Sequence, residues 1–280
     1  MGSDPIRLHL LHFSSDGSKT QLSVLVECIH FVVSLVRDFI ENAVGDFIRN
    51  DLGSKCFHRL NRRHLRFTKT VTVHKAVIDL EKLLDDIRAK PGHHVCFLSG
   101  NAENGVQMCV DHRVAVVQLV DLGPYSEVLQ RNVDSEVEIL GLTIGAALHE
   151  IGHLLGAFHS TQGIMSQRPN ATGLLPGRTS SVPCFFDSYS ICIFAHGPFF
   201  NHSISPARPP SVTYKIGRES VEIKCKSGIL LAVVIKETSY RDLKVYNDDL
   251  VSSISLRISE DSWDLIVIYN ALFNMEYVIK

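Results

Sequence analysis

Three histidines and one glutamate lie among mostly apolar residues in the stretch Ala147–Met165. His149 and His153 are four positions apart, so on a helix their imidazoles lie on one face, one turn apart. Two nitrogen ligands at this spacing can reach a single zinc ion. Glu150 is about 100° round the helix from His149. Its carboxylate is therefore placed to take a proton from a water at the metal, as a general base.

A catalytic zinc needs a third protein ligand, and a straight helix cannot bring His159 to the same face. Gly156 removes this obstacle, because glycine adopts the left-handed conformation that ends a helix and turns the chain. His159 can then complete a three-histidine site, with water in the open fourth position. The sequence therefore predicts Zn²⁺ held by His149, His153 and His159, with Glu150 as the catalytic residue. Each ligand should also have a hydrogen-bond acceptor at its other ring nitrogen.

The whole pattern from His149 to His159 resembles the extended zinc motif of the metzincin metallopeptidases at every fixed position. Gly163-Ile164-Met165 resembles the Met-turn of that clan, which implies that Met165 forms an apolar floor under the ligands and is not a ligand. The stretch is also similar to a largely uncharacterised zinc metallopeptidase family of fungi and animals. The resemblance implies a metzincin-like catalytic domain, with a mixed sheet and an active-site helix, that hydrolyses peptides or proteins.

The elements expected to position this motif alternate between strands and helices in the first half of the chain. A capping box, Ser135-x-x-Glu138, predicts where the motif helix begins, and Gly141 and Gly145 should let that helix sit close against a sheet. Val114–Leu122 is the predicted edge strand on which an extended peptide would add. The other expected elements are strands at Arg7–Phe13 and His94–Leu98 and helices at Leu22–Ile48 and Val77–Ala89.

The last third of the chain has a different pattern. Thr161–Pro210 is expected to be irregular, and Ala207–Pro210 has the composition of a linker. Ser211–Lys280 contains short β-branched runs separated by turn signals, which predict a small all-β, sandwich-like domain. The fold class expected is thus α+β, with a metzincin-like catalytic domain at 1–206 and a β-rich accessory domain at 207–280.

Composition excludes several classes of protein. The 280 residues are 45% hydrophobic and carry a formal net charge of −2, so a sizeable core is expected and no global field favours nucleic acid or membrane partners. Leu22–Ile40 is apolar but interrupted by charged residues, which indicates an amphipathic helix and not a membrane span. Because no secretory signal or membrane segment is visible, a cytoplasmic location is expected. Seven cysteines without a CxxC pair predict free thiols.

Some other residues allow two interpretations. Tyr189 could stabilise an oxyanion, although a tyrosine in a loop is more often structural. Trp263 is expected in the core and not on a sugar-stacking surface. The basic run His58–Arg66 is expected to be a solvated face, although it could bind an acidic partner. Cys109 and His112 have ligand chemistry, but the sequence pairs neither with a partner.

Two functions therefore remain open at this stage. The first is a zinc-dependent metalloendopeptidase, with the water activated by Glu150. The alternative is an inactive, vestigial zinc-binding protein that acts as a protein- or carbohydrate-binding module through its β-rich segment. The sequence does not decide the substrate, the cleavage specificity or the oligomeric state.

Overall fold

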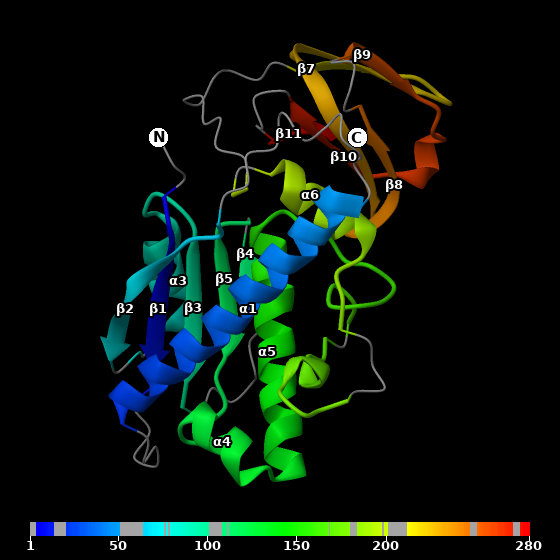
Figure 1. The fold of residues 1–280 in the computed structure, drawn as a ribbon. Helices are drawn as coiled ribbons and strands as arrows, with labels where there is room; N and C mark the ends of the chain where they lie inside the picture. Colours follow the sequence, from blue (N-terminus) through cyan, green and yellow to red (C-terminus); the bar gives the residue numbers. More distant parts are fainter. Residues whose placement is uncertain are drawn as a thin grey trace.

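The structure is a computed structural model, and two β-sheets with helices between them make up the part of the chain that it describes (Figure 1). It describes residues 4–13, 21–50, 64–75, 77, 79–100, 108–110, 112–167, 169–179, 184–197, 199–200, 212–246, 251–270 and 275–280. Most of the basic run His58–Arg66 and the whole linker Ala207–Pro210 lie outside these residues, and so does the expected domain boundary at 206/207.

The N-terminal sheet has five strands in the order β2-β1-β3-β5-β4. Its parallel strands are β1 (Ile6–His12), β2 (Phe67–Lys75), β3 (His94–Ser99) and β5 (Val114–Gln118). The short strand β4 (Met108–Val110) runs antiparallel to β5 at the edge. The sheet is therefore mixed, as expected, and its parallel pairs require long crossover connections.

Helices cover both faces of this sheet, which explains why β3 is buried along its whole length. α1 (Leu22–Asn50) lies between β1 and β2 in the sequence, and α3 (Leu80–Arg88) lies between β2 and β3. α1 packs on one face together with α5 (Asp134–Leu154), whereas α3 packs on the other face. A short helix, α4 (Tyr125–Arg131), precedes α5.

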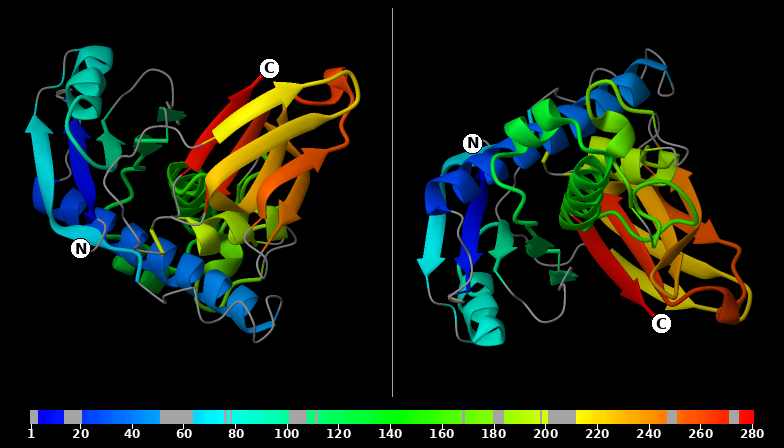
Figure 2. Two further views of the ribbon diagram at one scale, coloured as in Figure 1. Left: turned by 90° about the horizontal axis from the view of Figure 1, so that it is seen from above. Right: turned by 90° about the horizontal axis from the view of Figure 1, so that it is seen from below.

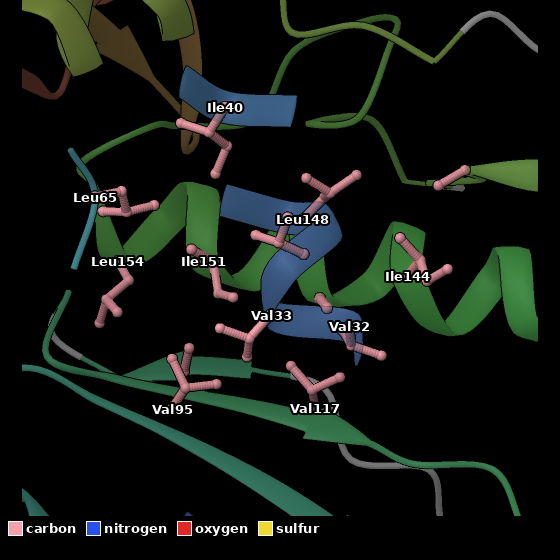
Figure 3. Packing of buried hydrophobic residues seen from close by; sticks show 14 of the residues in the cluster. Val32, Val33, Ile40, Leu65, Val95, Val117, Ile144, Leu148, Ile151 and Leu154 are labelled. Atoms are coloured by element: carbon pink, nitrogen blue, oxygen red, sulfur yellow. The ribbon is translucent and has the colours of Figure 1, made fainter. Parts of the chain in front are cut away.

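The main core lies between α1, α5 and the sheet. Figure 3 shows Val32 and Val33 of α1 facing Val117 of β5, with Ile144 and Ile151 of α5 beside them. All of these side chains are buried. Each such aliphatic side chain contributes roughly 1.5–3 kcal/mol when it leaves water, so the core fixes α5 firmly against the sheet.

The beginning of α5 differs from the sequence prediction. Val133 is the N-cap residue, no side chain caps the helix there, and Ser135 lies inside the first turn, so the predicted capping box does not form. Asp134 and Glu136 lie in this turn instead, where negative charge favours the positive end of the helix dipole. Arg131 pairs with Glu136 at 3.0 Å across the junction between α4 and α5.

The glycines of α5 do permit a close contact, but not with a sheet. A Cβ on Gly141 would lie 2.7 Å from Cα of Thr172, and one on Gly145 would lie 2.7 Å from the Pro169 carbonyl oxygen. The neighbour is the loop that leads into the short 3₁₀ helix η1 (Thr172–Leu174). The prediction of a sheet contact at these glycines was therefore wrong.

The second sheet is antiparallel and is built around one long strand. β7 (Val221–Lys236) pairs with β6 (Val212–Ile216) and β9 (Val251–Leu256) near its start, and with β8 (Ser239–Val245) and β10 (Leu265–Asn270) near its end. β11 (Met275–Ile279) pairs with β10, and the 3₁₀ helix η2 (Glu260–Ser262) precedes β10. These strands form a single six-stranded sheet, where the sequence led us to expect a sandwich. Trp263 is buried in its core, as expected.

One face of the second sheet packs against α6 and the segment that follows α5. In Figure 2, α5 is seen nearly end-on between the two sheets. α6 (Ser188–His196) lies within the stretch expected to be irregular, and its Cys192 and Ile193 join Phe158, Leu231 and Tyr269 in one buried cluster. The sequence missed α6. The division into domains at 1–206 and 207–280 stays a prediction.

Two general expectations concern the membrane and the thiols. Within the described residues, no helix has the length and apolar character needed to span a membrane. Five of the seven cysteines have described side chains, and none of these five is in a disulfide: Cys28, Cys96, Cys184, Cys192 and Cys225.

The α3 face of the N-terminal sheet contains three hydrogen-bonded histidines. Nδ1 of His9 lies 3.2 Å from Nε2 of His74, and Nε2 of His9 lies 3.0 Å from Nδ1 of His94. Burial lowers the pKa of His9 to about 3, with smaller contributions from His94 and His74, and burial also lowers the pKa of each of these two neighbours. The folded protein therefore holds His9 neutral.

We expect this cluster to make the fold sensitive to acid. Below pH 6.5 the unfolded chain binds more protons at His9 than the folded chain, so the free energy of unfolding falls as the pH falls from 6.5 towards 3. One such histidine accounts for at most about 1.4 kcal/mol per pH unit. Urea unfolding of wild type and His9→Gln at pH 5, 6 and 8 should give a shallower pH dependence in the variant, and equal slopes would contradict the expectation.

Candidate active site

α5 brings His149, Glu150 and His153 to its C-terminal end. His149 and Glu150 are buried and His153 is partly buried, because α1 and the sheet cover the other faces of the helix. The helix ends at Leu154 with Leu155 as its C-cap residue. His149 and His153 thus project from one helical face one turn apart.

The chain turns back at Gly156, as the sequence predicts. Gly156 has a φ of +100°, in the left-handed region that side chains avoid, and its N–H donates to the His153 carbonyl at 2.9 Å. A Cβ at this position would lie 2.8 Å from the hydroxyl oxygen of Tyr269. Glycine is therefore required at 156, both for this backbone conformation and because a Cβ would be too close to Tyr269. The turn brings His159 back towards His149 and His153.

The three histidines meet at their Nε2 atoms. Nε2 of His153 lies 3.1 Å from Nε2 of His149 and 3.2 Å from Nε2 of His159. Nitrogen ligands at 2.0–2.1 Å around a tetrahedral zinc would be about 3.3 Å apart. The spacing therefore fits one metal ion bound by all three rings, and these residues form a three-histidine group that could hold a metal.

Hydrogen bonds at the opposite ring nitrogens identify the tautomers. Nδ1–H of His149 donates to the Ile164 carbonyl at 2.7 Å, and Nδ1–H of His153 donates to the Ala157 carbonyl at 2.8 Å. A carbonyl oxygen can only accept, so Nε2 of each neutral ring carries a lone pair and no proton. Nδ1 of His159 lies 3.2 Å from Oγ1 of Thr238. Carbonyl acceptors are therefore present at His149 and His153, and a hydroxyl that is able to accept is present at His159.

Facing lone pairs at this distance repel one another unless a cation lies between them. Burial lowers the pKa of all three histidines, that of His153 to about 3, so the rings are neutral and can bind a metal at neutral pH.

Burial raises the pKa of Glu150 to about 7, and its Oε2 has no hydrogen-bond partner among the described residues. A buried carboxyl oxygen without a partner is costly, which favours a ligand or substrate beside it.

Met165 lies directly under the motif helix. Its side chain is fully buried, and a Cβ on Gly152 would lie 2.6 Å from its Sδ atom. Gly163, with a φ of +74°, starts the turn, and the Ile164 N–H donates to the Phe185 carbonyl at 2.8 Å. The same turn therefore places the Met165 side chain under the helix and the Ile164 carbonyl against His149.

The second sheet supplies residues at this site that the sequence did not reveal. The Phe158 N–H donates to the hydroxyl of Tyr240 at 2.8 Å, and the His159 N–H donates to the Thr238 carbonyl at 3.1 Å. No local sequence pattern identifies Thr238 or Tyr240, because both lie about eighty positions after the motif. The sequence left two interpretations of Tyr189, an oxyanion donor or, more often, a structural residue. Tyr189 lies in α6 and stacks on Tyr240 with ring centroids 5.2 Å apart, which is a packing contact.

Two further expectations about the site change. β5 pairs on both sides, so Val114–Leu122 does not provide the edge strand, and β4 is the edge strand beside β5. His112, unpaired in the sequence interpretation, has a φ of +50° and donates from Nδ1 to the His153 carbonyl at 2.6 Å. The side chain of Cys109 lies outside the described part of the structure.

Comparisons with known proteins bear on the motif and on the fold separately. A family model described as "Putative peptidase family" matches residues 130–169, which include the three histidines, Glu150 and Met165. Among curated proteins, none matches the chain.

The fold resembles that of OgpA from Akkermansia muciniphila. A wild-type OgpA structure superimposes with a TM-score of 0.58 and 13% identity, covering 99% of this chain and 93% of OgpA. Catalytically inactive OgpA in complex with an O-glycopeptide, glycodrosocin, gives a TM-score of 0.58 and 13% identity, with 99% and 92% covered. The resemblance extends over both sheets, so the mixed α/β architecture as a whole has a known counterpart.

Proposed function

We propose that this protein is a zinc-dependent metallopeptidase that hydrolyses peptide bonds. The observation that carries the proposal is the convergence of three histidine Nε2 atoms, two of them fixed as unprotonated, at the end of the helix that also carries Glu150, whose buried Oε2 has no partner among the described residues. A structural zinc site would use four protein ligands, whereas three histidines leave one position open for water and substrate. Imidazole ligands in this number suit zinc better than calcium or magnesium, which prefer oxygen ligands.

A zinc ion held by these rings would polarise the scissile carbonyl and lower the pKa of a water towards 7. Glu150 would accept the proton from the attacking water and then donate it to the leaving nitrogen of the peptide bond. Burial raises the pKa of Glu150 to about 7 in the metal-free protein, and a cation bound nearby would favour the ionised form that accepts a proton. Met165 would support the ligand helix from below without contacting substrate.

The substrate would lie along β4. This strand is the edge of the N-terminal sheet on the side next to α5, and an extended peptide can add to such an edge through backbone hydrogen bonds. The family model supports a peptidase, and the OgpA complex shows that a protein of this fold binds an O-glycopeptide. Peptides and O-glycopeptides are therefore the substrates to test first.

The alternative is a protein that binds zinc without hydrolysis and uses its second sheet to recognise a protein or a carbohydrate. No observation in the described residues favours it, since Trp263 is buried and Glu150 is intact. It predicts full zinc occupancy with no cleavage of any denatured protein or peptide, so the experiment below separates the two functions.

Substitution of Glu150 tests the proposed role of the base. Glu150→Gln keeps the shape of the side chain but cannot take up a proton, so we expect cleavage to fall by about 10²–10⁴-fold. The zinc content should stay at the wild-type level, because Glu150 is not a ligand. The measurement is hydrolysis of a peptide and O-glycopeptide library, with and without a chelator, paired with metal analysis. Undiminished cleavage by the variant would overturn the mechanism.

Gly156→Ala tests whether the turn is required for metal binding. The added Cβ meets Tyr269 in a left-handed backbone, so the variant should be destabilised by about 1–3 kcal/mol and should bind zinc more weakly. Gly177→Ala is a matched control, because Gly177 has a φ of +71° but no described atom within 4 Å of the added Cβ. Denaturant unfolding and zinc titration of both variants should show weakened zinc binding only in Gly156→Ala. Equal zinc affinity in the two would contradict the role of the turn.

A further inference from the structure

The hairpin between β7 and β8 holds the third histidine by its backbone. The His159 N–H donates to the Thr238 carbonyl at 3.1 Å, and the Tyr240 N–H donates to the His159 carbonyl at 3.3 Å. His159 thereby pairs with Ser239 in a parallel β-bridge. These hydrogen bonds locate the His159 backbone against the second sheet, but they leave the rotation of its imidazole free.

A side chain of the same hairpin contacts the ring. Oγ1 of Thr238 lies 3.2 Å from Nδ1 of His159, whereas the rings of His149 and His153 are oriented by backbone carbonyls. Thr238 therefore provides the one hydrogen bond among these three that a side-chain substitution can remove. With Nδ1–H donated to the hydroxyl, the lone pair of His159 Nε2 faces the other two ligands.

The backbone of Thr238 is unfavourable for its residue type. Glu237 and Thr238 have φ values of +49° and +65°, as in a hairpin turn that strongly prefers Asn, Asp or Gly. A β-branched residue at positive φ is a genuine outlier, and such strain occurs where function requires the side chain. Asp264 supports the turn, because it accepts from the Glu237 N–H at 2.8 Å and from Nζ of Lys236 at 3.1 Å.

We propose that Thr238 is a positioning residue for the metal site, retained at a strained turn because its hydroxyl orients the imidazole of His159. The proposal deepens the proposed function and rests on it. It also assigns a role to the second sheet: the hairpin that ends β7 completes the metal site. A β-rich segment serving only as an accessory module would not contribute to the geometry of a ligand.

The test compares metal affinity in full-length variants of the hairpin. Thr238→Val keeps the branched shape and removes the hydroxyl, so the Kd for zinc, measured by competition with a chelator, should rise by about 10–100-fold. Thr238→Ser keeps the hydroxyl and should stay within about threefold of wild type. Ser239→Ala removes the neighbouring hydroxyl and should leave the Kd unchanged. The visible absorption of the Co²⁺-substituted protein should differ from wild type only in Thr238→Val.

Thr238→Gly separates positioning from general stabilisation. Glycine relieves the strain at positive φ, so the metal-free variant should unfold at a higher temperature than metal-free wild type. Its zinc affinity should nevertheless fall as in Thr238→Val. A residue that only stabilised the hairpin would change the two quantities in the same direction, so parallel changes would overturn the proposal.

The outcomes also distinguish this proposal from the proposed function. Wild-type zinc affinity in Thr238→Val, with Glu150-dependent cleavage intact, overturns the role of Thr238 alone. Weakened zinc binding in Thr238→Val, together with full cleavage by Glu150→Gln, supports the positioning role and overturns the peptidase mechanism. A wild-type protein that binds no metal overturns both.

Discussion

The close approach of three imidazole rings at their Nε2 atoms is the constraint on which the site depends. Left alone, neutral rings at 3.1–3.2 Å would rotate or separate, so each ring must be held by a hydrogen bond at its far nitrogen. Those acceptors come from three different segments: the loop after the helix, the turn at Met165 and the β7–β8 hairpin. The convergence of the three rings is therefore a property of the tertiary structure as much as of the motif.

The fold supplies these acceptors by enclosing one helix between two sheets. Burial in the main core fixes α5 against the first sheet, and a second apolar cluster, which includes Phe158 and Tyr269, fixes the second sheet against the segment just after α5. Phe158 immediately precedes the third histidine. Packing of this side chain therefore brings the hairpin to within hydrogen-bonding distance of His159, and the polar contacts then set the angle of the ring.

The local features of the site could be predicted from the sequence because they depend on chemistry within a few residues. Helical spacing predicts that His149 and His153 share a face, and only glycine readily adopts the φ observed at Gly156. Most strands of the second sheet were also recognisable from their β-branched runs. By contrast, the predicted capping box does not form, and Asp134 and Glu136 in the first turn of α5 pair with Arg178 and Arg131 instead.

The remaining features required knowledge of contacts between distant segments. The sequence does not show that Val114–Gln118 is covered by β4, because sheet order is decided by pairing and not by composition. Thr238 and Tyr240 carry no motif, and their importance follows only from where β7 ends. α6 was missed because its nine residues lie in a segment whose Ser, Pro, Gly and Asn content favours loops.

The contact between Gly152 and Met165 limits how this motif can vary. Residue 152 is one of the two unspecified positions between the first two histidines. Yet the Met165 sulfur occupies the volume that any side chain there would need. A larger residue at 152 would have to displace the side chains of Met165 and Phe186 that pack against the helix. In related sequences, a bulkier residue at position 152 should therefore be accompanied by a smaller residue at position 165.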